Sequence, residues 1–243
     1  MNKTLISILT VASFTSLFSV TALSAPVANL KVSGDIKPPT CVVNGGDEDI
    51  LFDFGAISPS LIPSGPVPYK LPSLFSNINI TCDAATYLSF KSQDFYDALI
   101  YPEGWGLGRK AVTFSIVNAN DTSKVVGGVV YDVTSPMVDG IAANISRGND
   151  GADPDASWGG SNRIMKGATM GWTSTAKNAV SPSDMNFKAG KIFTATIKTS
   201  SDSNSSGANT YILSKDNFLS QDMDISEGID YMGQAVLTFN FGI

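Results

Sequence analysis

Few residues in this sequence could carry out catalysis, and histidine is absent from all 243 positions. Without imidazole there is no Ser–His–Asp or Cys–His catalysis, no His-ligated zinc and no histidine pH switch. Ser174 and Lys177 match the SxxK nucleophile pattern, but complete SDN and KTG partners are missing. The glycine-rich stretch 104–109 does not fit GxGxxG and is expected to be a loop. The sequence predicts neither an enzyme nor a cofactor.

Two kinds of binding residue occur in one polar stretch. Asn149, Asp150, Asp153 and Asp155 could offer oxygen atoms to calcium, but their spacing is not that of an EF-hand, and a solvated acidic loop is the alternative. Trp158 lies in the same stretch, where a core role is hard to supply. Aromatic rings in loops can serve as binding platforms, which makes Trp158 a candidate glycan contact.

The overall composition is that of a folded, acidic protein. Hydrophobic residues make up 43% of the chain and charged residues 16%, whereas disordered chains combine low hydrophobicity with high net charge. The formal net charge is −6. An acidic balance supplies no electrostatic attraction for nucleic acid and argues against a polybasic membrane-surface protein.

The first 24 residues have the pattern of a secretory signal peptide. Lys3 gives a positive start, an apolar run follows over 5–20, and Ala22 and Ser24 provide the small residues that a signal peptidase reads. We expect cleavage after Ser24, and a membrane anchor is the alternative. The mature chain is then exported, and 25–243 is expected to form one domain.

Export changes the interpretation of the two cysteines, Cys41 and Cys82. An even number of cysteines in an oxidising compartment indicates a disulfide, which would close a long loop and stabilise the fold by about 4 kcal/mol. The alternative is a pair of free thiols, but the chain has no CxxC motif and two thiolates alone make a poor metal site.

The rest of the chain is dominated by alternating apolar and polar residues bounded by turn residues, which predicts strands. Short helical turns are expected at 94–100 and 212–220, and long polar connections at 147–162 and 199–209. Many short strands separated by turns indicate an antiparallel sandwich or barrel. The expected strands are 30–36, 50–54, 77–82, 86–91, 111–119, 125–133 and 191–199.

The C-terminal residues 229–243 carry the sharpest alternation and are expected to form one extended strand. One face is apolar and the other mostly polar. The apolar face includes Ala235, Leu237, Phe239 and Phe241.

Four stretches of this chain together resemble subunits of chaperone–usher pili. They are LKVSGDIKPPTC, DFGAI, INITCDAAT and GQAVLTFNFGI, and the resemblance covers mainly 28–91 and 229–243. The opening GDIKPPTC is similar to the GxIxPxxC start of a branch of uncharacterised fimbrial-like proteins of Gram-negative bacteria. The residue next to last is Gly242, where the family usually has an aromatic residue.

The resemblance implies an all-β, immunoglobulin-like antiparallel β-sandwich that lacks its last strand and is completed by a donated one. By this analogy Ala235, Leu237, Phe239 and Phe241 belong to the strand that pairs with a chaperone or a neighbouring subunit. The segment 25–33 is the donor, with Ala28, Leu30 and Val32 as its inward-facing residues.

The implied function is that of a structural subunit of a surface fimbria, in a minor or tip-proximal position with a role in adhesion. The implied partners are a periplasmic chaperone, an outer-membrane usher, other pilus subunits and a host or surface glycan. The alternative is a self-sufficient secreted β-sandwich that binds glycan.

Overall fold

The structure is a computed structural model that describes residues 30–34, 36–46, 49–103, 105–154, 160–201 and 208–241. It divides into two compact units, Met1–Lys37 and Pro38–Ile243. The predicted signal peptide, Ala28, Asp155 and Trp158 lie outside the described residues.

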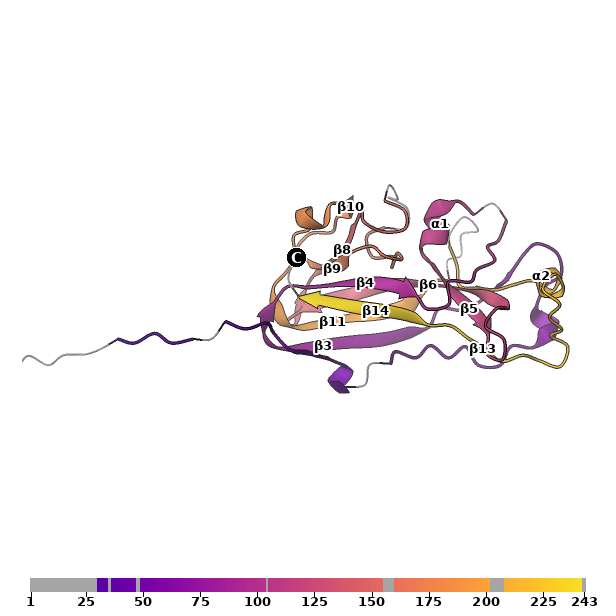
Figure 1. The fold of residues 1–243 in the computed structure, drawn as a ribbon, viewed down its shortest axis with the longest axis horizontal. Helices are drawn as coiled ribbons and strands as arrows, with labels where there is room; N and C mark the ends of the chain where they lie inside the picture. Colours follow the sequence, from indigo (N-terminus) through magenta and orange to yellow (C-terminus); the bar gives the residue numbers. More distant parts are fainter. Residues whose placement is uncertain are drawn as a thin grey trace, which may run out of the picture. The chain divides into compact units, whose positions relative to one another are not determined.

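The unit Pro38–Ile243 is built from strands joined by turns (Figure 1). Its described strands are β1 (Cys41–Val43), β2 (Tyr69–Lys70), β3 (Phe75–Thr86), β4 (Leu88–Asp94), β5 (Thr113–Asn118), β6 (Val125–Val138), β7 (Ile141–Ala142), β8 (Asn144–Gly148), β9 (Met170–Thr173), β10 (Asn178–Val180), β11 (Gly190–Thr199), β12 (Tyr211–Ile212), β13 (Tyr231–Met232) and β14 (Ala235–Phe241). The helical segments are α1 (Leu107–Ala111), α2 (Lys215–Leu219) and single 3-10 turns at Asn44–Gly46, Pro59–Leu61 and Pro182–Asp184. The predicted all-β class is confirmed.

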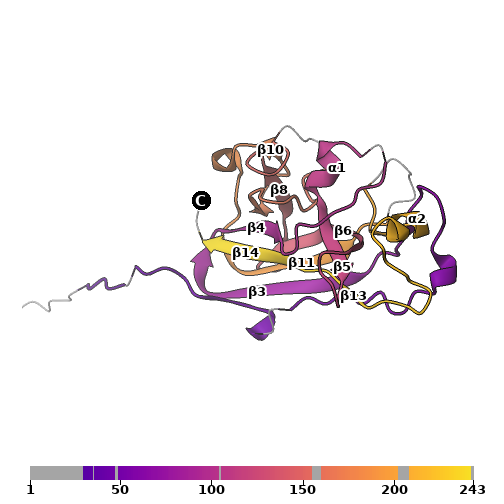
Figure 2. The same cartoon turned by 45° about the vertical axis from the view of Figure 1, so that its right-hand side comes forward.

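These strands form two sheets that pack face to face as a sandwich (Figures 1 and 2). The larger sheet has the order β1-β3-β11-β6-β12-β2, with β5 and β7 also pairing with β6, and β13 pairing with β5. The smaller sheet has the order β10-β8-β9-β4-β14. All described pairs are antiparallel except β10 with β8.

Strand β3 shows why the sequence alternation produces this arrangement. Ile78, Ile80 and Cys82 are buried, whereas Asn79 and Thr81 between them are exposed. Successive side chains of a strand point to opposite faces, so one face of β3 joins the core and the other meets solvent. The same rule predicted this strand from its sequence.

Trp172 of β9 joins the two sheets at the centre of the core. Its ring contacts Phe90 of β4 with centroids 5.9 Å apart, and Phe193 of β11 with centroids 5.6 Å apart. The indole Nε1 also donates a 3.0 Å hydrogen bond to the carbonyl oxygen of Thr194 on β11. A buried indole needs such a polar partner, and here the partner lies in the opposite sheet.

A buried ion pair fixes the chain before β9 to the larger sheet. Arg163 donates from Nε to Asp132 Oδ1 at 2.8 Å and from Nη2 to Asp132 Oδ2 at 3.1 Å, and Asp132 belongs to β6. The same Nη2 donates to Ser200 Oγ at 2.9 Å. This two-point contact matches the planar guanidinium to the carboxylate.

The structure corrects several sequence-based expectations. No helix forms at 94–100, where β4 ends at Asp94 and the residues after it form no helix or strand. The helix α2 lies inside the expected 212–220 turn. The stretch 104–109, expected to be a loop, contains the start of α1. The described residues of 30–36 and the alternating residues 50–54 form no strand. Among the described residues, no helix has the length and apolar character needed to cross a membrane.

The expected single C-terminal strand is divided into β13 and β14, which pair with different sheets. Gly233 lies at the division. A Cβ atom at this position would lie 2.6 Å from the carbonyl oxygen of Ser115 on β5, so only glycine allows the chain to pass this close.

Candidate functional site

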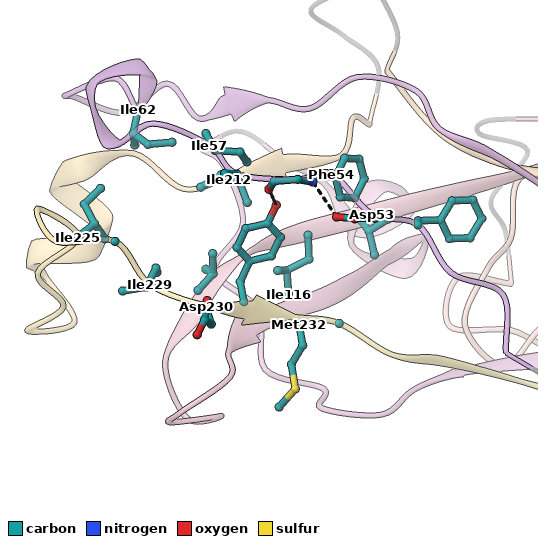
Figure 3. Close-up of a pocket in the computed structure, with 18 of the residues that line it drawn as sticks. Asp53, Phe54, Ile57, Ile62, Ile116, Ile212, Ile225, Ile229, Asp230 and Met232 are labelled. Carbon is teal, nitrogen blue, oxygen red and sulfur yellow. Dashed lines mark hydrogen bonds between the residues drawn. The ribbon is translucent and has the colours of Figure 1, made fainter.

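An open cleft of about 1010 Å³ lies between two segments that are far apart in the sequence. One wall is the segment 50–57, and the other is the C-terminal segment 225–233, which contains β13. Figure 3 shows Phe54 and Ile57 on the first wall, and Ile225 and Ile229 on the second.

The segment 50–57 has the side-chain pattern of a strand but no strand partner. Ile50, Phe52, Phe54 and Ile57 are half-buried and pack against the core, while Leu51 between them is 81% exposed. No β-ladder pairs this segment with any described strand. Within the segment, Gly55 uses its backbone groups in other bonds, because its N–H donates to Asp53 and its carbonyl oxygen accepts from Tyr231.

The second wall runs along the edge of the larger sheet. Tyr231 and Met232 form β13, which pairs only with β5 among the described strands. The Tyr231 hydroxyl donates a 3.2 Å hydrogen bond to the carbonyl oxygen of Gly55 on the opposite wall. Partial burial, and then the nearby Asp53 carboxylate, raise the pKa of Tyr231, so the hydroxyl keeps its proton and remains a donor.

The floor of the cleft is made from the hydrophobic core. Ile116, Val126, Val129 and Ile212 line it and are themselves buried. Tyr131 also lines the cleft, and burial, followed by the charge of Asp94, raises its pKa. An apolar floor of this kind suits alternate apolar side chains rather than a charged ligand.

The rim of the cleft is acidic. Asp53, Glu227 and Asp230 are among the lining residues, and the described lining contains no lysine or arginine. The carboxylates lie on the two walls, above an apolar floor. The electrostatic character of the cleft therefore favours a segment with basic residues between its apolar ones.

Beyond Gly233 the same run of chain continues as β14, the predicted pairing strand. Among the described strands β14 pairs with β4 alone, so it is an edge strand (Figures 1 and 2). Ala235, Leu237 and Phe239 are half-buried and pack against the core. The Phe239 ring lies 5.9 Å from that of Phe90, centroid to centroid.

Phe241, the fourth residue predicted for the pairing face, is at the end of the described strand. Its side chain is 45% exposed, and Val236 on the alternate positions is 39% exposed. The register pairs Phe241 with Leu88, the first residue of β4, so the ladder ends at this position. The covered part of the face consists of Ala235, Leu237 and Phe239.

The predicted disulfide between Cys41 and Cys82 is confirmed, and it lies where β1 meets β3. These two residues are also directly opposite each other in the register of the two strands. The chain leaves β1 shortly before the segment 50–57 begins. The disulfide therefore fixes the chain to the larger sheet ahead of the first wall.

The predicted donor residues that the structure describes are exposed. In the unit Met1–Lys37, Leu30 is 98% exposed and Val32 101%. Ile36, at the same spacing, is 104% exposed, and residues 30–34 and 36–37 form no strand or helix. Apolar side chains at alternate positions without any cover are unusual for a soluble protein.

Most of the cleft could not be predicted from the sequence. The alternation of Ile50, Phe52 and Phe54 predicts an ordinary strand of the sandwich, which does not form. No local sequence pattern identifies Ile225 and Ile229 as part of the cleft, because only the fold places them opposite the segment 50–57.

The other sequence candidates take structural roles. Ser174 and Lys177 lie in the connection between β9 and β10, where Ser174 Oγ donates to the carbonyl oxygen of Asn186 and Lys177 Nζ donates to that of Asp184. The carboxylate of Asp150 accepts hydrogen bonds from Thr169 and pairs with Lys91. The described residues contain no group of three or more metal-ligating side chains.

Comparison with known proteins adds no relative to these observations. No protein-family model matches the chain, and no curated protein matches it significantly.

Proposed function

We propose that this protein is a structural subunit of a surface fimbria and that the cleft accepts a strand donated by another polypeptide. The observation that carries the proposal is the cleft itself, with an apolar floor, a wall at 50–57 that lacks a strand partner, and a C-terminal edge strand that continues from the second wall. A donated strand supplies backbone hydrogen bonds along its length and side chains at alternate positions.

The exposed N-terminal segment has the properties of such a donor. Leu30, Val32 and Ile36 lie at even positions, so an extended strand would present them on one face. Lys31 lies between them and would face away from the floor, toward a rim that carries Asp53 and Asp230. In a fibre, this segment of one subunit fills the cleft of the next.

The physical requirement for a partner follows from the cost of leaving the cleft open. Unpaired backbone groups on an edge strand are a template for aggregation, and exposed apolar surface adds to this hazard. A periplasmic chaperone that lends a strand removes both problems until an usher brings the next subunit. The proposed route is export to the periplasm, capture by the chaperone and assembly on the cell surface.

The experiment that tests the proposal uses the mature chain and a synthetic peptide of 25–37. The peptide is added to subunit released from its chaperone, and light scattering reports aggregation. We expect the peptide to suppress aggregation and to bind with a stoichiometry of one. The Leu30→Lys peptide should lose this protection, because its charge would have to enter the apolar floor.

The matched control is the Asn29→Lys peptide, which carries the same added charge on the opposite face of the strand. It should protect as well as the original peptide. If the mature chain alone is soluble, monomeric and indifferent to all three peptides, the protein is an independent domain and the proposal is wrong.

A further inference from the structure

A second cleft, of about 920 Å³, lies on the opposite face of β14 from the core. Its floor is formed by the outward residues of β4 and β14, and the connections that carry Lys166 and Phe187 border it. Strand alternation separates the two sites, because Leu237 and Phe239 face the core while Thr238 and Asn240 line this cleft.

Four polar side chains in this cleft are free to bind a ligand. Gln93, Lys166, Thr238 and Asn240 all line it, and none of their side chains makes a hydrogen bond or ion pair with another described residue. They offer amide, hydroxyl and ammonium groups, so donors and acceptors are both present. Gln93 lies on β4, and Thr238 and Asn240 lie on the adjacent strand β14. The ladder between these two strands, in which Gln93 is paired with Val236, fixes their backbones.

An aromatic ring borders the polar strip of this cleft. Phe187 is half-buried. The Phe187 ring packs closely on β9, because a Cβ atom at Gly171 would lie 2.7 Å from its Cε1 atom. The glycine thus makes room for the ring beside the polar strip. Phe187 provides a flat apolar surface next to hydrogen-bonding groups, a combination typical of small-molecule sites.

The charges around the cleft are nearly balanced. Lys91 pairs with Asp150 at 2.9 Å, and Asp150 is also held by the Thr169 backbone N–H and hydroxyl. Among the lining residues, the two lysines Lys91 and Lys166 are matched in number by the two carboxylates of Asp94 and Asp97. A strongly anionic or cationic ligand therefore has no excess of opposite charge to bind.

We infer that this cleft binds a neutral oligosaccharide. Sugar hydroxyls match the free amide, hydroxyl and ammonium groups, and the apolar face of a sugar ring matches Phe187. The volume lies within the usual range of ligand sites, about 300–1,000 Å³. The inference does not depend on strand donation, because none of the residues that line this cleft lines the first one.

The border of the cleft is fixed in place by backbone hydrogen bonds. Lys166 N–H donates to the carbonyl oxygen of Ala111 at 2.9 Å, and Gly167 N–H donates to that of Ser92 at 2.8 Å. Ser92 Oγ also donates to the carbonyl oxygen of Met165 at 2.9 Å. A site held in this way loses little conformational entropy when a ligand binds.

The test uses the mature chain, in its chaperone complex where that is the form recovered. The probes are galactose-, mannose-, fucose- and N-acetylglucosamine-terminated oligosaccharides, screened by saturation-transfer NMR. At least one should bind saturably and shift the side-chain amide signals of Gln93 and Asn240. Thr238→Arg should abolish binding by filling the cleft, and Asn240→Ala should weaken it about fivefold.

The control is Thr81→Arg, an exposed threonine on the outward face of β3 in the other sheet. It should bind as the unmodified chain does. Far-UV circular dichroism confirms that each variant folds, and Asn240→Ala, which adds no bulk, decides the matter if Thr238→Arg does not fold. Saturable binding that Asn240→Ala and Thr238→Arg leave intact, or no binding to any probe, would overturn the inference.

Discussion

The Tyr231 hydroxyl reaches across the first cleft and donates its hydrogen bond to the carbonyl oxygen of Gly55. Gly55 has a positive φ of 66°, in the left-handed region that favours glycine. Its N–H is bonded to the carboxylate of Asp53, so the turn presents the carbonyl toward Tyr231. This single contact ties the wall at 50–57, which lacks strand pairing, to the edge of the larger sheet.

Tyr231→Phe should make the first cleft easier to enter. The variant keeps the ring but removes the bond between the walls, so an incoming strand no longer has to break it. We expect faster binding of the 25–37 peptide and a loss of about 0.5–1.5 kcal/mol in the free energy of unfolding. Stopped-flow fluorescence with labelled peptide measures the rate. Tyr87→Phe, an exposed tyrosine that does not line the cleft, is the control and should leave the rate unchanged.

Phe239→Asp should damage the subunit much more than Thr238→Asp. Phe239 is half-buried against Phe90, so a carboxylate there loses hydration without gaining a partner, at a cost of several kcal/mol. Thr238 is exposed on the other face of the same strand. Urea denaturation measures the stability, and co-purification with the chaperone measures the pairing. Equal losses for the two variants would show that the alternation of β14 does not define a pairing face.

Replacement of Cys41 or Cys82 by serine should cost about 2–5 kcal/mol and lower the periplasmic yield. The bond closes a long loop that includes the whole wall at 50–57, so its loss frees that wall in the unfolded chain. Peptide mapping by mass spectrometry under non-reducing conditions should find the two cysteines linked in the mature protein. Free thiols in periplasmic material would contradict the prediction.

The free energy of unfolding should fall as the pH rises above about 10. Burial raises the pKa of Tyr131 and of Tyr211, with Asp94 adding to the first and Tyr101 to the second. A raised pKa in the folded state favours the protonated phenol, so this stabilisation is fully present below the unfolded pKa and is lost as the pH rises through the folded one.

Urea midpoints between pH 8 and pH 11.5 test this dependence, and absorbance at 295 nm reports phenolate. Tyr211→Phe should reduce the slope of stability against pH, although it also loses the 2.7 Å bond from the Tyr211 hydroxyl to the carbonyl oxygen of Ile100. The appearance of all phenolate absorbance near pH 10 in the native protein would be inconsistent with the raised pKa values.

Asp132→Ala should destabilise the fold by about 3–5 kcal/mol, because it removes the carboxylate that accepts two hydrogen bonds from the buried Arg163 guanidinium. Arg163→Met in the same background should recover part of the loss, since it removes the charge that this carboxylate balances. Chemical denaturation of the two variants and of the double variant gives the coupling between them. A double variant as unstable as Asp132→Ala would mean that the buried charge of Arg163 is not the cause of the destabilisation.

The sequence predicted the sandwich because alternation and turn residues act locally. The strands expected at 77–82, 125–133 and 191–199 lie within β3, β6 and β11. The same rule failed at 30–36 and 50–54, where the alternation is as regular but no strand forms. Alternation records which side chains face an apolar surface, whereas a strand also needs a neighbour for its backbone.

The binding surfaces could be predicted only in part. The alternation over 229–243 identified the half-buried Ala235, Leu237 and Phe239, since these depend on one strand. The opposition of Ile57 to Ile229 depends on how distant segments pack, and no local pattern encodes it.

The disulfide also determines how the domain would carry tension. In a fibre, a pull on the N-terminal segment enters the domain just before Cys41, where β1 has only three residues and would peel from β3 by breaking its hydrogen bonds one at a time. The covalent bond to Cys82 passes the load directly to β3, whose ladder with β11 extends from Phe75 to Thr86. The covalent path to β3 does not pass along the wall at 50–57, so tension on the N-terminal segment would reach a long strand of the larger sheet before it reaches that wall.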